Sequence, residues 1–105
     1  MAKNIDKQII DNVKRYVANV STDYNVESAF LFGSYAKGTQ KNDSDIDVAV
    51  VIKNIDNRIL VTGKLYGYNH GIDTRIEPHV IGLDEYINRD SMIAREIVKS
   101  GIRIV

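Results

Sequence analysis

Two aspartates near the middle of the chain, Asp45 and Asp47, are the residues that could most directly do chemistry. They stand at the start of the apolar run 46–52, which is typical of a buried strand. Side chains alternate along a strand, so both carboxylates face the same way, roughly 6.6 Å apart along the chain. Like charges this close raise each other's pKa and cost stability, and a bound divalent cation removes that cost. The pair is a candidate Mg²⁺ site, although Asp-x-Asp alone is also typical of a solvated strand end.

A Gly-Ser pair, Gly33 and Ser34, follows the preceding apolar run. Glycine lets the backbone approach a ligand closely and accepts unusual dihedral angles. We expect Ser34 to cap a short helix over residues 35–37 that ends at Gly38. Backbone N–H groups at a helix N-terminus favour phosphate, so this turn is a candidate phosphate-binding site. Lys37 would add positive charge there, or would be an ordinary solvent-exposed lysine.

The order of these features is more specific than any one of them. An apolar strand, Gly-Ser, ten residues, Asp-x-Asp and a second apolar strand follow one another. This pattern, over roughly residues 26–81, resembles the signature of the nucleotidyltransferase superfamily related to DNA polymerase beta. Its spacing is similar to that of the minimal nucleotidyltransferases, the small stand-alone members. The resemblance implies an α+β nucleotidyltransferase fold, with a small mixed sheet and helices packed mainly on one face.

The same resemblance implies Mg-dependent chemistry on a nucleoside triphosphate, with ATP as the expected donor. Two Mg²⁺ ions would be present in the active complex, both held by Asp45 and Asp47. Ser44 matches the family's Ser-Asp-x-Asp form, and we expect its hydroxyl to bond local backbone and fix the loop. The Gly-Ser pair would contact the β- and γ-phosphates, so that pyrophosphate leaves. The expected nucleotide-binding residues are therefore Gly33, Ser34, Lys37 and Ser44.

The family has a third carboxylate on a strand beside the acidic pair. We expect that strand over residues 72–81, where a period of two places four polar residues on one face. These residues are Asp73, Arg75, Glu77 and His79. We prefer Glu77 as the third metal ligand and aid to deprotonation of the acceptor, with Asp73 as the alternative, although the family usually has aspartate here. Pro78 cannot donate to a ladder and predicts a strand edge or end. His79 could meet a phosphate or base, or could be exposed to solvent.

The acceptor is inferred from the resemblance and from size. Relatives that modify antibiotics or polynucleotides carry extra domains, whereas about 25 residues follow the third expected strand here. We therefore expect AMP transfer from ATP to a protein, by the antitoxin of a toxin–antitoxin pair. Its partner would be a small all-helical HEPN-type RNase, modified on a tyrosine. Two alternatives stay open: an antibiotic-type enzyme acting on a small molecule, with its acceptor site built between subunits of a homo-oligomer, and a non-catalytic binding module.

The elements that must position these residues follow from hydrophobic periodicity. Apolar residues at helical spacing predict a first helix over residues 4–20, with Tyr16 on its apolar stripe. Continuous apolar residues predict two strands buried on both faces. The expected order is helix 4–20, strand 26–32, helix 35–37, strand 46–52, helix 56–68, strand 72–81, helix 82–88, helix 91–100 and an edge strand over 102–105.

Composition narrows the functional classes. The chain has 105 residues and a formal net charge of zero, and we expect one domain over 1–105. Without a basic stripe, strong nucleic-acid binding is not expected. There is no cysteine, which excludes disulfides and thiolate metal sites. No apolar run approaches the ~20 residues of a membrane span, and residues 1–11 lack a signal-peptide pattern, so we expect no membrane association and a cytoplasmic location.

Overall fold

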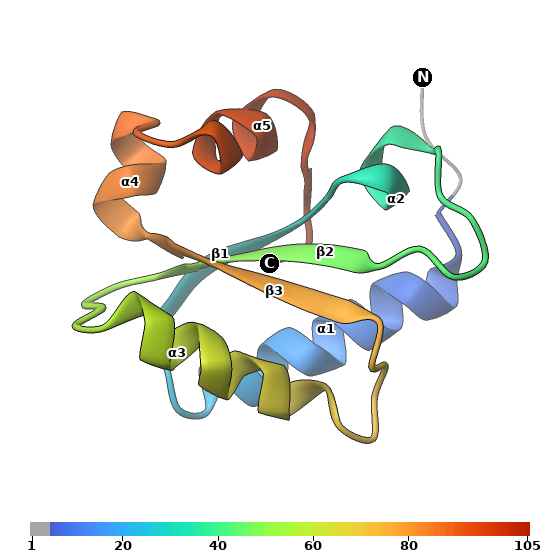
Figure 1. The fold of residues 1–105 in the computed structure, drawn as a ribbon, viewed down its shortest axis with the longest axis horizontal. Coiled ribbons are helices and arrows are strands. Elements are labelled where there is room, and N and C mark those ends of the chain that lie inside the picture. The colour runs from blue at the N-terminus through green and yellow to red at the C-terminus, as the bar shows by residue number, and fades with distance from the viewer. Residues whose placement is uncertain (1–4) are drawn as a thin grey trace.

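A four-stranded mixed sheet forms the centre of the computed structural model, which describes residues 5–105 (Figure 1). The strand order is β3-β2-β1-β4. β1 (Val26–Phe32) pairs antiparallel with both β2 (Ile46–Ile52) and β4 (Ile102–Arg103), whereas β2 pairs parallel with β3 (Ile76–Gly82). The predicted α+β class and mixed sheet are confirmed, as is the short C-terminal edge strand.

Within residues 5–105, five α-helices lie around the sheet. They are α1 (Lys7–Ser21), α2 (Ser34–Lys37), α3 (Arg58–Leu65), α4 (Leu83–Asn88) and α5 (Met92–Ser100), and α3 continues as the 3₁₀ helix η1 (Tyr66–Asn69). Polar side chains begin three of the helices: Asp6 accepts a hydrogen bond from a backbone N–H of α1, Asn57 from α3 and Ser91 from α5. The first residue of the expected helix 4–20, Asn4, lies outside the described residues.

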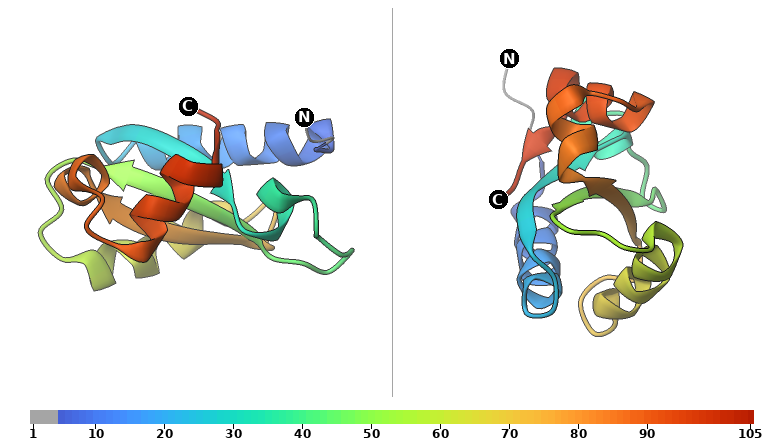
Figure 2. Two further views of the ribbon diagram at one scale, coloured as in Figure 1. Left: turned by 90° about the horizontal axis from the view of Figure 1, so that it is seen from above. Right: turned by 90° about the vertical axis from the view of Figure 1, so that its left-hand side faces the viewer.

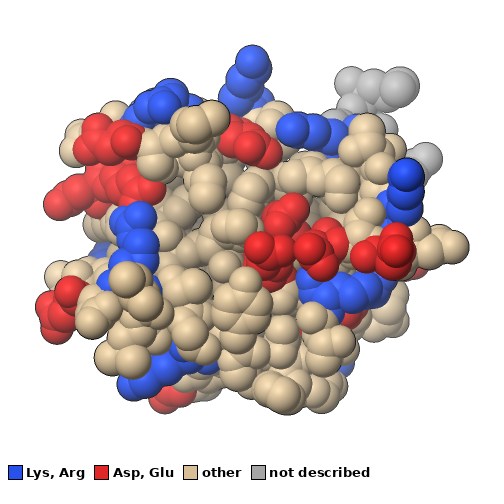
Figure 3. Space-filling model, in the orientation of Figure 1, with Lys and Arg blue, Asp and Glu red and all other residues tan. Residues whose placement is uncertain are grey.

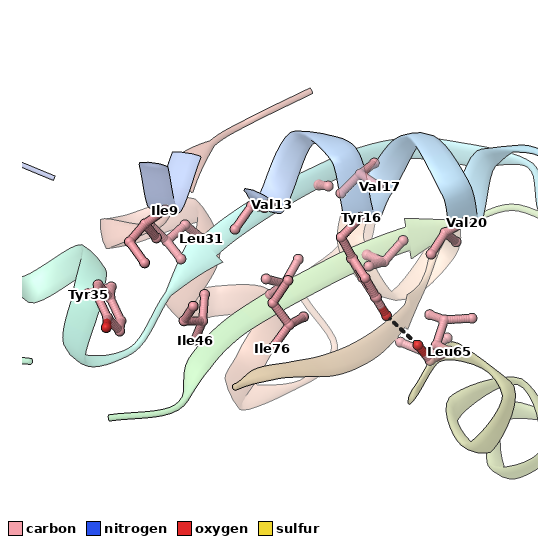
Figure 4. Close-up of a cluster of buried hydrophobic side chains, with 14 of the residues drawn as sticks. Ile9, Val13, Tyr16, Val17, Val20, Leu31, Tyr35, Ile46, Leu65 and Ile76 are labelled. Atoms are coloured by element: carbon pink, nitrogen blue, oxygen red, sulfur yellow. Dashed lines mark hydrogen bonds between the residues drawn. The ribbon is translucent and has the colours of Figure 1, made fainter. Parts of the chain in front are cut away.

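Helices cover both faces of the sheet, as the end-on view in Figure 2 shows. The larger core lies between the sheet and α1 and α3, and part of it is drawn in Figure 4. Within it, the fully buried Tyr16 donates a hydrogen bond of 2.7 Å to the Leu65 carbonyl, which ties α1 to the end of α3. A smaller core, containing Phe32 and Ile97, lies under α4 and α5 on the other face. The helices α1 and α3 pack on the face expected to carry most of the helices, and α4 and α5 cover the other face as well.

The third strand begins later than predicted, at Ile76 rather than residue 72. Asp73 accepts hydrogen bonds from the backbone and side chain of Arg75, and this local turn competes with strand pairing. β3 is an edge strand, as Pro78 predicted, but it continues past the proline to Gly82. The charged side chains of residues 73–79 consequently divide between a turn and a strand.

Among residues 5–105, no helix has the length and apolarity needed to cross a membrane.

Candidate active site

The starts of β2 and β3 bring two acids and a histidine together. Their parallel register pairs Asp47 with Glu77, and Ala49 with His79. The His79 Nε2 atom lies 3.3 Å from Asp47 Oδ1 and 3.9 Å from Glu77 Oε1. Metal-ligating atoms of the three residues all lie within 4.8 Å of one another. Figure 3 shows acidic side chains gathered at the surface of this part of the molecule.

Asp45 completes the acidic cluster from the residue just before β2. It is exposed, and its interaction with Glu77 is one of the causes that raise the pKa of the Glu77 carboxyl group. Burial is the largest of these causes, followed by the carboxyl group of Asp45 and the charge of Asp47, while His79 opposes the shift. All three acids expected to hold metal are therefore neighbours, and their like charges disfavour ionisation of Glu77.

Asp73, the alternative third acid, has a different environment. Its Oδ2 accepts a 2.7 Å hydrogen bond from Arg75 Nη2 and a 3.3 Å bond from Asn12 Nδ2. The side chain is 9% exposed, and the hydrogen bonds from Arg75 lower the pKa of Asp73. Arg75 also donates to the Tyr35 hydroxyl at 3.3 Å. Asp73 is thus a partnered acid that holds the turn before β3 to α1 and α2.

Gly33 lies directly against the acidic cluster. Its φ of +72° is a left-handed conformation that L-residues rarely adopt, and a Cβ there would lie 2.2 Å from Asp47 Oδ2. Gly33 also occupies the N-cap position of α2, so the prediction that Ser34 caps this helix is wrong: Ser34 is its first residue. The helix ends at Gly38, as predicted, with a left-handed φ of +76°.

The other two expected nucleotide-binding residues, Ser44 and Lys37, each have a partner outside the acidic cluster. The Ser44 hydroxyl accepts a 2.7 Å hydrogen bond from the Lys41 backbone N–H, so its predicted local bond is confirmed. Lys37 is exposed at the end of α2, with its Nζ 3.8 Å from Glu96 Oε2 on α5. Ser44 therefore stabilises the loop before Asp45, while Lys37 links α2 to α5.

Two residues near the cluster were not among the expected site residues. The His79 ring packs edge-on against Phe32, with centroids 4.9 Å apart, and its side chain is 25% exposed. Its alternation with Glu77 on one strand face was the sequence signal for this position. Tyr66 is 44% exposed, and burial followed by the charges of Glu77, Asp45 and Asp47 raises its pKa. Helical periodicity alone gave no signal for Tyr66, because its relation to the acids comes from the packing of η1 on β3.

This donor set is suited to a divalent cation. Carboxylate oxygens are the preferred ligands of Mg²⁺, and three converging carboxylates lose their mutual repulsion when such an ion binds. Around one ion with bonds of ~2.1 Å, adjacent ligand atoms lie ~3 Å apart and opposite ones ~4.2 Å. The separations of 3.3 and 3.9 Å from His79 Nε2 lie between these two values, and the ligand atoms of Asp47, Glu77 and His79 are all within 4.8 Å of one another. The residues present therefore fit a metal ion.

Comparisons with known proteins agree on one family. The model described as "Polymerase beta, Nucleotidyltransferase" matches residues 8–105. Two candidate protein adenylyltransferases of Methanocaldococcus jannaschii are similar to the chain. MJ1215 is 40% identical over 43 residues, covering 41% of this chain and 50% of that protein. MJ0435 is 42% identical over 41 residues, covering 39% of this chain and 44% of that protein. The matched stretch spans about half the length of these curated relatives.

Solved structures share the fold at low sequence identity. A candidate nucleotidyltransferase of Sulfolobus solfataricus superimposes with a TM-score of 0.67 and 23% identity, covering 91% of this chain and 78% of that chain. A toxin–antitoxin structure with AMP-PNP gives a TM-score of 0.58 and 23% identity, covering 91% of this chain and 72% of that chain. A variant of the MntA–HpeT toxin–antitoxin gives a TM-score of 0.57 and 21% identity, covering 91% of this chain and 72% of that chain.

The crowding at Gly33 can be separated from backbone strain by comparing two glycines. Gly33→Ala and Gly38→Ala both force alanine into a left-handed conformation, which costs about 1–2 kcal/mol. Only Gly33→Ala also drives a methyl group into Asp47, since nothing lies within 4 Å of a Cβ at Gly38. Urea unfolding should show the larger loss of stability for Gly33→Ala, and Mg²⁺ titration should show weakened binding for that variant alone. Equal effects of the two substitutions would contradict the crowding.

The opposite pKa shifts of Glu77 and Asp73 predict opposite effects of neutralising them. The folded-state pKa of Glu77 is raised, so stability from its protonation is present below pH ~4 and is lost as pH rises through the folded pKa. Without metal at pH 7, Glu77→Gln should therefore stabilise the fold, by up to about 1 kcal/mol given solvent screening. The folded-state pKa of Asp73 is lowered, so Asp73→Asn should destabilise by about 1–3 kcal/mol at pH 7.

Urea unfolding in EDTA from pH 3 to 7 checks both signs. The difference in the free energy of unfolding between Glu77→Gln and wild type should disappear below pH ~4. The difference between Asp73→Asn and wild type should narrow as pH falls through the lowered pKa of Asp73. Destabilisation by Glu77→Gln at pH 7 would show that Glu77 has a structural role instead.

Proposed function

The chain belongs to the polymerase beta nucleotidyltransferase family, and we propose that it transfers AMP from ATP to a protein acceptor in a Mg²⁺-dependent reaction. The observation that carries this proposal is the convergence of Asp45, Asp47 and Glu77 beside the Gly33 turn. Nucleotidyl transfer needs a rigid group of carboxylates beside a phosphate-binding backbone. The acids and the Gly33 turn lie together where β1 ends and where β2 and β3 begin.

Each part of the site has a proposed role in holding ATP. Asp45, Asp47 and Glu77 hold the divalent ions, which when bound neutralise the triphosphate and polarise its phosphoryl oxygens. Gly33 and Ser34 contact the β- and γ-phosphates through the turn that begins α2. Lys37 adds a positive charge at the end of this short helix, and Ser44 keeps the loop before Asp45 in place through its bond to Lys41.

The chemical step is an in-line displacement at the α-phosphorus. Glu77 accepts the proton of the acceptor hydroxyl as general base. The acceptor oxygen then bonds to the α-phosphorus while the bond from that atom to the β-bridging oxygen breaks. Pyrophosphate leaves and AMP remains on the acceptor.

A protein acceptor is supported by the relatives and by exposed apolar side chains on α3 and η1. The similar M. jannaschii proteins are candidate protein adenylyltransferases, and two structural neighbours are toxin–antitoxin structures. On this chain, Ile59 of α3 is 86% exposed and Tyr66 of η1 is 44% exposed. The charges of the three acids contribute, after burial, to the raised pKa of Tyr66. We propose that the partner is a small helical toxin of the HEPN type, which contacts this apolar surface in the cytoplasm.

Transfer of labelled phosphate tests the proposal. Wild-type protein, Mg²⁺ and ATP labelled at the α-phosphate are added to lysate of the source organism. We expect label on a small protein with wild type, and a loss of at least about a thousandfold with Asp45→Asn/Asp47→Asn. Asp43→Asn, which neutralises an exposed acid in the adjoining loop, is the matched control and should label normally.

A second label identifies the reaction. ATP labelled at the γ-phosphate should leave the acceptor unlabelled, because pyrophosphate is the leaving group. Transfer of the γ-label would indicate a kinase, and α-label confined to small molecules would rule out the protein acceptor. Labelling by the double aspartate variant at the wild-type rate would contradict the assigned site.

A further inference from the structure

His79 places a ring nitrogen beside the acidic cluster. Its Nε2 atom, rather than the ring face, is directed at Asp47 Oδ1 at 3.3 Å, and Glu77 Oε1 is 3.9 Å away. The imidazole is two residues beyond Glu77 on the same face of β3, opposite the small Ala49. This placement gives the ring room to lean across the strand pair toward Asp47.

The imidazole is also held in orientation by its packing. The ring lies edge-on against Phe32 at 4.9 Å between centroids and 71° between planes, and Phe32 belongs to the smaller buried core. Three quarters of the His79 side chain is removed from solvent. A side chain fixed in this way can present one ring nitrogen to an ion without a large loss of conformational freedom.

We propose that His79 is a direct ligand of the divalent ion at Asp47 and Glu77, and that the site consequently binds Mn²⁺ more tightly than Mg²⁺. Mg²⁺ favours an all-oxygen shell, whereas imidazole is a ligand of the transition metals, and Mn²⁺ accepts both carboxylate and imidazole. Two carboxylates and one imidazole within 4.8 Å form such a mixed set. This inference rests on the proposed function in one respect, namely that a divalent ion binds at Asp47 and Glu77.

Pulsed EPR of Mn²⁺ bound to the protein, without nucleotide or affinity tag, tests the ligand directly. An imidazole that coordinates Mn²⁺ produces a characteristic ¹⁴N modulation of the electron spin echo. The chain has two histidines and no cysteine, so the source of such a signal can be assigned by two substitutions. His79→Gln removes the proposed ligand but keeps a polar side chain of similar length, and His70→Gln removes the exposed histidine before β3.

We expect the ¹⁴N modulation in wild type and in His70→Gln, and its loss in His79→Gln. The affinity for Mn²⁺, from the EPR signal of the free ion, should fall at least about tenfold in His79→Gln. Affinity for Mg²⁺, measured by competition, should change less than for Mn²⁺. Urea unfolding of both histidine variants confirms that they are folded.

Further outcomes separate this inference from the proposed function. Mn²⁺ binding that is lost in Asp47→Asn but shows no imidazole modulation in wild type would overturn the role of His79 and leave the carboxylate site intact. A modulation that persists in His79→Gln would likewise overturn it. Failure of wild type to bind Mn²⁺ would overturn both the His79 ligand and the metal site.

Discussion

The parallel register of β2 and β3 is the constraint on which the site depends. Ile46 faces Ile76 in this register, and both are buried in the larger core beneath α1 and α3. Because side chains alternate, a shift of one residue would expose Ile76 and bury Glu77. The apolar core thus forces Asp47 and Glu77 together on the opposite face, where their repulsion is a consequence of burying the isoleucines. Hydrophobic packing, rather than any attraction within the site, positions the acids.

The rest of the site accommodates this crowding. Gly33 has no side chain to obstruct Asp47, and its left-handed conformation turns the chain from β1 into α2 beside the carboxylates. His79 supplies a hydrogen-bonding group to Asp47 at 3.3 Å. Burial and neighbouring carboxylates raise the pKa of Glu77, whereas the hydrogen bonds from Arg75 lower the pKa of Asp73. A divalent ion that binds here gains affinity from relieving strain that the fold already contains.

Sequence reasoning was accurate where local pattern and tertiary packing agree. The ranges of β1 and β2 match the expected strands because continuous apolar runs, ended by a glycine or by polar residues, leave little ambiguity. The start of β3 was placed too early, because the hydrogen bonds of Asp73 with Arg75 override the alternation of residue types. The environment of His79 could not be predicted, since its contact with Phe32 connects strands β3 and β1 across β2. Glu77 and Asp73, similar in the sequence, differ because Asp73 is paired with Arg75 whereas Glu77 lies beside other carboxylates.

Stability as a function of Mg²⁺ concentration tests most directly whether the acids crowd together to hold metal. The free energy of unfolding would be measured for wild type and Asp45→Asn/Asp47→Asn in EDTA and at increasing Mg²⁺. The double variant should be at least as stable as wild type without metal, whereas only wild type should gain stability with Mg²⁺, by about 2.7 kcal/mol at 100 times Kd. A double variant that fails to fold, or that gains as much stability as wild type, would contradict this account and make the acidic pair structural.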